Sequence, residues 1–123
     1  MRLQQLQLLL TLARTGSMRA SAEAMNVTQP ALTKALKQLE EEFGATLVLR
    51  SPKGVRLAPA GEMLAARAAT VVREIERARE VWRKKFGQPA VDPAGRAKQM
   101  RFLAARGFGS EAIRRVVRGA DDD

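Results

Sequence analysis

Two consecutive segments between Ser17 and Phe43 repeat their hydrophobic residues at helical spacing. A spacing of three or four residues places side chains on one side of an α-helix, so each segment predicts a helix with one apolar face. Two such faces can pack against each other, which predicts a helical pair. The apolar residues are Met18, Ala22 and Met25 in the first segment, and Leu32, Leu36, Leu39 and Phe43 in the second.

Residues suited to helix ends and turns stand before and between these segments. Ser17 and Thr28 each precede an apolar run, where a side-chain oxygen can accept a hydrogen bond from a free backbone N–H of the first turn. Asn26 lies between the runs and suits a tight turn. The order of short helix, turn and longer helix is typical of a helix-turn-helix motif.

The second helix has a polar side that would face solvent. Amide, hydroxyl and ammonium groups of this kind suit the base edges and phosphates of nucleic acid. An ordinary helical hairpin with a solvated face explains the same pattern, so the pattern alone leaves both interpretations open. The polar side consists of Gln29, Thr33 and Lys37, beside Pro30, Lys34 and Gln38.

A leucine-rich helix precedes this motif and would brace it. Gly16 ends that helix just before the Ser17 cap, because glycine readily adopts the left-handed conformation found at helix C-termini. The expected buried face consists of Leu3, Leu6, Leu10 and Ala13, widened by Leu9 and Leu12.

A short hairpin, or wing, is predicted after the motif. Residues 47–50 and 55–57 alternate apolar and other side chains, and the sequence Ser-Pro-Lys-Gly at 51–54 is typical of a turn. Lys53 at its tip, with Arg50 and Arg56 on the flanking strands, could reach a phosphate backbone or could simply keep the turn soluble.

A long helix follows, from Pro59 to Phe86, with no helix-breaking residue before Gly87. Its apolar residues are spaced four and three apart in alternation, which is a heptad seam. We expect this seam to bind a second copy of the chain, since it is long relative to the core available, although packing within one chain would satisfy the same pattern. The predicted dimerisation residues are Leu64, Ala68, Val71, Ile75 and Ala78.

Two further helices are predicted in residues 87–123. Asp92 precedes Pro93 and should cap the first, Gly107 should end it, and Ser110 should cap the second. Their apolar groups are too many to leave in water, so we expect them to pack against the end of the long helix. Trp82 continues the spacing of the seam, but we expect it to pack with this tail, so that the dimer seam stops near Ala78. The apolar side consists of Met100, Leu103 and Ala104, then Ile113, Val116 and Val117, with four arginines facing outward in the second half.

Charge favours nucleic acid as the partner. The 123 residues hold 22 Lys and Arg against 13 Asp and Glu, a formal charge of +9 with a sequence pI near 11.2, spread along the chain. Cysteine and histidine are absent, which removes Cys/His zinc sites, Ser-His-Asp triads and cysteine nucleophiles, so we expect neither an enzyme nor a cofactor. The N-terminal apolar run is interrupted and predicts neither a signal peptide nor a membrane span, which leaves the cytoplasm by default.

Residues 1 to about 80 resemble the N-terminal DNA-binding domain and linker helix of LysR-type transcriptional regulators. The resemblance runs in register from LQQLQLLLTLARTGS to RSPKGVRLAPAG, although Ser21 stands where alanine is usual. It implies that the helix after Thr28 enters the major groove of double-stranded DNA. The implied base contacts are Gln29, Pro30, Ala31 and Thr33. The expected phosphate contacts are Ser17, Thr28, Lys34, Lys37, Lys53 and Arg56.

From about Glu76 onward, the chain resembles the C-terminal three-helix repeat of RecX, a modulator of the RecA recombinase. The resemblance lies in ERAREVWRKKFG and RAKQMRFLAARGFGSEAIRRVVRG. We therefore interpret the chain as a fusion of two truncated genes, joined inside one continuous helix. The large effector-binding domain that follows in LysR-type proteins has no room here, so no small-molecule effector is expected.

The sequence thus predicts a mainly α-helical protein: a winged helix-turn-helix domain at 1–58, a linker and dimerisation helix at 59–86, and a RecX-like helical tail at 87–123. The predicted function is sequence-specific DNA binding by a homodimer that regulates transcription, with no membrane partner. Two alternatives stay open, a RecX-like modulator that contacts RecA through the tail, and a non-functional fusion remnant that still folds.

Overall fold

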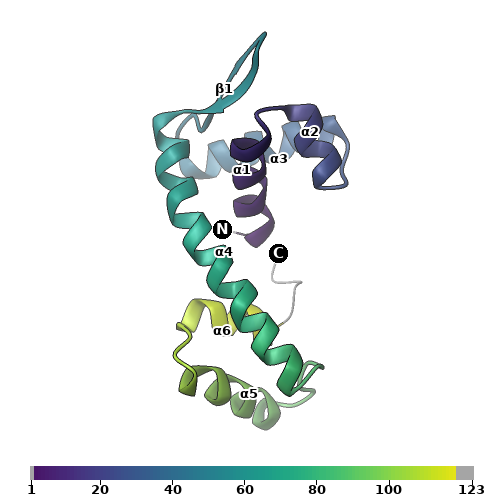
Figure 1. Ribbon diagram of the computed structural model, residues 1–123, viewed down its shortest axis with the longest axis vertical. Coiled ribbons are helices and arrows are strands. Elements are labelled where there is room, and N and C mark those ends of the chain that lie inside the picture. Colours follow the sequence, from purple (N-terminus) through teal and green to yellow (C-terminus); the bar gives the residue numbers. More distant parts are fainter. Residues whose placement is uncertain (1, 119–123) are drawn as a thin grey trace. The chain divides into compact units, whose positions relative to one another are not determined.

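The computed structural model describes residues 2–118, which are mainly helical, as predicted (Figure 1). The order of the elements confirms a winged helix-turn-helix followed by a long helix and a helical pair. The elements are α1 (Leu3–Thr15), α2 (Met18–Ala24), α3 (Gln29–Phe43), β1 (Val48–Ser51), β2 (Gly54–Leu57), α4 (Pro59–Lys85), α5 (Pro93–Ala105) and α6 (Ser110–Val117).

Packing divides the chain into two compact units, and the boundary lies inside α4, between Ala69 and Thr70. The first unit contains the winged helix-turn-helix and the start of α4. The second contains the rest of α4 with α5 and α6. The boundaries predicted from composition treat the long helix as a segment of its own, whereas packing shares it between the units.

The core of the first unit is built mostly from leucines of α1 and α3. Leu9, Leu12, Leu32, Leu39 and Leu47 are almost completely inaccessible to solvent. The face predicted for α1 was partly wrong, because Leu10 is only half-buried and Ala13 is exposed. In a helix this rich in leucine, several faces are apolar, and the neighbouring helices select the buried one. The residues that α1 buries are Leu3, Leu6, Leu8, Leu9 and Leu12.

The predicted helix ends are confirmed around the turn of the motif. The Ala20 N–H donates to Ser17 Oγ at 3.0 Å, and the Ala31 N–H donates to Thr28 Oγ1 at 3.2 Å. Asn26 has φ +59° and Gly16 has φ +68°, both in the left-handed region that tight turns and helix ends require. Local chemistry therefore places both ends of α2 and the start of α3.

Two side chains differ from the predicted pattern in this unit. Phe43, predicted on the apolar face of α3, is 38% exposed because it lies in the last turn, where the helix leaves the core. Ser21, which replaces the usual alanine, is completely buried, and its hydroxyl lies 2.6 Å from Thr15 Oγ1. This hydrogen bond satisfies the buried hydroxyl, so serine is tolerated in the core.

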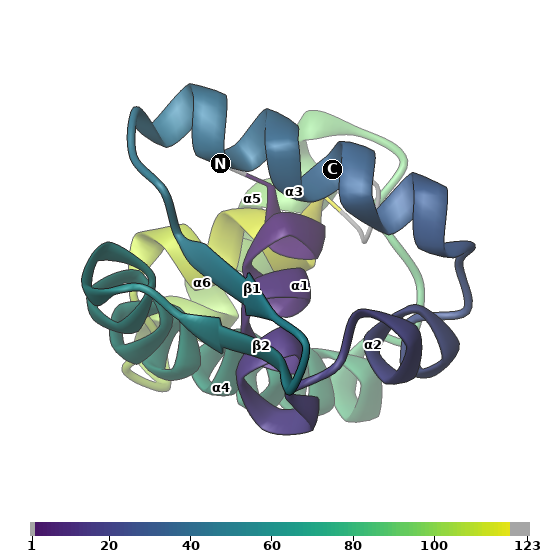
Figure 2. The same cartoon turned by 90° about the horizontal axis from the view of Figure 1, so that it is seen from above.

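The wing is a two-stranded antiparallel hairpin that lies next to α1 (Figure 2). Val48 pairs with Leu57 and Ser51 pairs with Gly54, which leaves residues 52 and 53 as the turn. The Val55 N–H donates to the Gly16 carbonyl at 2.9 Å, and this joins the wing to the turn between α1 and α2. A Cβ on Gly54 would collide with the same carbonyl, so this close approach requires glycine.

In the second unit, α5 and α6 lie beside the second half of α4, so the tail is docked as predicted (Figure 1). The Trp82 indole N–H donates to Gln99 Oε1 at 3.0 Å. The Phe86 and Phe102 rings meet edge to face, with centroids 5.3 Å apart. The buried apolar residues of this unit are Val72, Ile75 and Ala78 of α4, Leu103 of α5, and Ala112, Ile113, Val116 and Val117 of α6.

The apolar side predicted for α5 was wrong in two of its three residues. Met100 is 42% exposed and Ala104 is exposed, whereas the polar Gln99 is 6% exposed. Gln99 can be buried because both ends of its amide are paired, with its Nε2 donating to the Gln88 carbonyl at 3.0 Å. A pattern of hydrophobic residues cannot predict this, since the partners of Gln99 come from other segments.

The start of α6 also differs from the prediction. Ser110 is its first residue rather than its cap, and Gly109 occupies the cap position without a side-chain bond. A carboxylate from α4 contacts this cap residue, because the Gly109 N–H donates to Glu74 Oε2 at 2.8 Å. The end of α5 is as predicted, with Gly107 at φ +93° and the Phe108 N–H donating to the Leu103 carbonyl at 3.3 Å.

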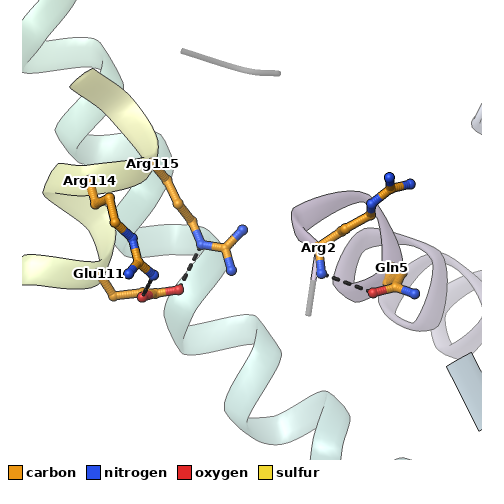
Figure 3. A network of polar contacts seen from close by, with 5 residues as sticks. All are labelled: Arg2, Gln5, Glu111, Arg114 and Arg115. Carbon is orange, nitrogen blue, oxygen red and sulfur yellow. Dashed lines mark hydrogen bonds and ion pairs between the residues drawn. The ribbon is translucent and has the colours of Figure 1, made fainter. Parts of the chain in front are cut away.

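One of the four arginines predicted to face outward is instead buried. Arg115 is 9% exposed, and its Nε donates to Glu111 Oε1 at 2.8 Å (Figure 3). Arg114 bonds to the other oxygen of the same carboxylate. The hydrogen bond from Arg115 is the main cause that lowers the pKa of Glu111, and the charges of the two arginines add to it. Glu111 therefore remains ionised and compensates the buried guanidinium.

Candidate nucleic-acid interface

The predicted base-reading residues lie on the accessible side of α3. Gln29, Pro30 and Ala31 form its first turn and are exposed, and Thr33 is half-buried one turn further. The opposite side of the helix is anchored in the core by Leu32, Leu36 and Leu39. Because that side is fixed, the polar first turn is presented to solvent in one orientation.

The predicted phosphate contacts lie in the same unit and differ in how free their side chains are. Lys34 and Lys37 on α3 are exposed, as are Lys53 in the turn of the wing and Arg56 on β2. The Ser17 and Thr28 oxygens already accept helix-capping bonds. Each hydroxyl still has its proton, which can be donated to a phosphate oxygen.

Glu40 is a residue of this unit that the sequence analysis missed. Its Oε2 accepts the Leu47 N–H at 2.8 Å and the Val48 N–H at 3.3 Å. One carboxylate near the end of α3 thus holds the strand that starts the wing. A carboxylate near a helix C-terminus is electrostatically unfavourable. The position of Glu40 near the end of α3 is therefore the feature of the sequence that could have indicated its structural role.

Replacing Glu40 with alanine should lower the free energy of unfolding by about 1–3 kcal/mol, because two partly buried N–H groups lose their acceptor. Glu40→Gln keeps an acceptor oxygen and should lose less. Urea unfolding of both variants measures this. The matched control is Glu41→Ala, since Glu41 is an exposed neighbour on the same helix. Equal losses in Glu40→Ala and Glu41→Ala would contradict the assignment.

The predicted dimerisation residues fall into two groups. Leu64 and Val71 are half-buried, so part of each side chain is available to a second copy of the chain. Ala68, Ile75 and Ala78 are at most 2% exposed within the single chain. Only the first group offers surface for a dimer without rearrangement, and dimerisation through α4 stays a prediction.

Within residues 2–118, no three His, Cys, Asp or Glu side chains are grouped so that they could hold a metal ion. Over the same residues, every helix is too short or too polar to cross a lipid bilayer.

Two family models match separate parts of the chain. Residues 3–62 match the bacterial regulatory helix-turn-helix proteins of the lysR family. Residues 73–117 match the third three-helix domain of RecX. The first match ends and the second begins within α4, so the transition between them lies inside one continuous helix.

Similar proteins are found for both parts. The regulatory protein RecX of Leptothrix cholodnii is 49% identical over 85 residues, which cover 68% of this chain and 52% of that protein. The uncharacterized HTH-type transcriptional regulator YkuM of Bacillus subtilis is 44% identical over 80 residues, covering 65% of this chain and 27% of that protein. The chain thus spans about half, or less, of the length of these relatives.

Among solved structures, the CbnR DNA-binding domain in its complex with DNA superposes with a TM-score of 0.63 at 30% identity. The superposition covers 68% of this chain and 97% of the CbnR domain. The fold, with the exposed first turn of α3, is that of the winged helix-turn-helix class. More particularly, residues 3–62 are a LysR-type helix-turn-helix domain and residues 73–117 are a RecX-type three-helix domain, which confirms both resemblances.

Proposed function

We propose that the chain regulates transcription by binding a specific site on double-stranded DNA through its first unit. The observation that carries this proposal is the exposed polar first turn of α3 on a helix whose other side is fixed in the core. The likeness to CbnR, whose DNA-binding domain was solved with DNA, supports it.

In the proposed complex, α3 lies in the major groove and the wing contacts the adjacent backbone. The Gln29 amide can donate to and accept from an adenine edge, which distinguishes this base from the others. Lys34, Lys37, Lys53 and Arg56 would neutralise phosphates and fix the position of the helix on the duplex. Two copies joined through the half-buried Leu64 and Val71 would present two α3 helices to a palindromic site.

Lys34→Ala and Lys53→Ala should each reduce the salt dependence of DNA binding. Each neutralised phosphate contributes about 0.9 to the slope of log affinity against log salt, so each variant should lower the slope by about that amount and keep the base preference. Fluorescence anisotropy with a selected duplex at several salt concentrations measures this. Arg67→Ala removes a charge from an exposed position on α4 and should leave the slope unchanged. A slope equally reduced in this control would argue against localised contacts.

Gln29→Ala should relax the preference at one base pair of each half-site. A bidentate amide contact is worth about 1–3 kcal/mol of discrimination, and alanine has no group to replace it. Binding to a panel of single-base variants of the selected site provides the measurement. If the substitution weakens binding to all sequences equally, Gln29 does not read a base and the role of α3 must be reassigned.

The second unit supports another candidate function, modulation of the RecA recombinase. The supporting observation is that the RecX-type part is folded, with Trp82, Gln99, Phe86 and Phe102 in contact, and is similar to regulatory RecX proteins. A pull-down with RecA, repeated with Gln29→Ala, tests this function separately from DNA reading. Capture of RecA by both forms would support it, whereas transcript changes on gene deletion without RecA capture would favour regulation alone.

A further inference from the structure

The larger part of the positive charge lies outside the LysR-type domain. Residues 70–118 hold 13 Lys and Arg against five Asp and Glu, whereas residues 2–69 hold nine against five. With the three aspartates at 121–123, residues 70–123 have a formal charge of +5, against +4 for residues 1–69. Reading of DNA by α3 does not use this second excess.

A small cleft in the second unit gathers part of this charge. It has a volume of about 260 Å³ and lies between α5 and α6. Arg96, from the first turn of α5, and Arg114 and Arg118, from α6 and its end, line it. The rest of the lining consists of the apolar Met100 and buried Val117, together with Ser110 and the acidic Glu111.

The three arginines of the cleft are not equivalent. Arg114 shares the Glu111 carboxylate with the buried Arg115, so its charge is already partly compensated. Arg96 and Arg118 are not in this network, and neither side chain has a hydrogen bond or an ion pair within residues 2–118. The cleft thus presents two guanidinium groups that have no acceptor among those residues.

A guanidinium group presents paired donors in one plane, which match the oxygens of a phosphate. It also keeps its positive charge at any physiological pH. The cleft is smaller than the sites that bind drug-sized ligands, but its size suits one phosphodiester with its sugar against the apolar lining. We propose that this cleft binds a backbone phosphate of duplex nucleic acid without regard to sequence, through Arg96 and Arg118, and gives the chain a second contact besides α3.

The test uses the full chain with Arg96→Ala and Arg118→Ala combined, and a random-sequence duplex as the probe. Loss of the contact to this one phosphate should lower the slope of log affinity against log salt by about 0.9. The matched control is Arg73→Ala with Arg77→Ala, which removes the same charge from an exposed face of α4, where Glu76 and Glu80 lie alongside. Unchanged Trp82 fluorescence and helicity verify that both variants are folded.

The proposal is overturned if the control lowers the slope as much as the cleft variant does, or if neither changes it. A competition experiment identifies the class of ligand. An excess of unlabelled duplex should displace the bound probe. Displacement by inorganic pyrophosphate or by an aspartate-rich peptide at equal charge would overturn nucleic acid as the ligand. Gln29→Ala should relax the base preference to the same extent in the cleft variant as in the otherwise unchanged chain. Failure of the cleft therefore stays distinguishable from failure of α3 to read DNA.

Discussion

Ile75→Glu should unfold the second unit, whereas Val71→Glu should leave it folded and act on dimerisation alone. Both residues belong to the predicted heptad seam, but Ile75 is 1% exposed and Val71 is half-buried. A carboxylate at position 75 would lie in the apolar interior without a partner, which should cost more than about 3 kcal/mol. At position 71 the carboxylate can reach solvent, and the loss should be about 1 kcal/mol.

Circular dichroism and urea unfolding measure the stability of the two variants, and sedimentation at micromolar concentration measures their mass. We expect Val71→Glu to be a folded monomer if α4 joins two copies. Val71→Ala is the control, because it shortens the side chain without adding charge. A folded Val71→Glu that remains dimeric would show that α4 packs within one chain, and a stable Ile75→Glu would contradict the burial of this residue.

Removing residues 88–123 should shift the fluorescence of Trp82 to longer wavelength. Trp82 is the only tryptophan, so its emission reports on this one site. Its indole N–H donates to Gln99, and the neighbouring Phe86 ring contacts Phe102, so the deletion exposes the indole and removes both contacts. The deletion also exposes Ile75 and Ala78, which are buried in the complete chain, to solvent. This new apolar surface on α4 should reduce the solubility of the shortened protein.

Val71→Glu is the control for this measurement, because it acts on the predicted dimer and keeps the tail. Its emission should be unchanged. Gln99→Leu is a finer variant, which keeps the volume but leaves the indole N–H without its acceptor. The reverse pattern, with emission sensitive to Val71→Glu and insensitive to the deletion, would mean that Trp82 belongs to the dimer seam.

The local features of this protein follow from its sequence alone. Ser17, Thr28 and Asp92 cap helices, and Gly16 and Asn26 adopt left-handed turns, because each interaction involves residues a few positions apart. The period of the apolar residues likewise predicted the helices and the hairpin, since burial of one face follows from the geometry of each element. These features were enough to predict the class of fold and the exposed side of α3.

Contacts between the elements select which of several suitable side chains are buried and which polar groups they pair with. The inner face of α1 could not be read from a run of leucines, because the choice depends on the helices that cover it. Gln99 and Arg115 are buried because Trp82 and Glu111 pair with them, and Glu40 and Glu74 serve backbone N–H groups of other elements. The contacts of Trp82 with Gln99 and of Glu74 with Gly109 join residues 17 and 35 positions apart, and a buried polar group is stable only when such a partner is in place.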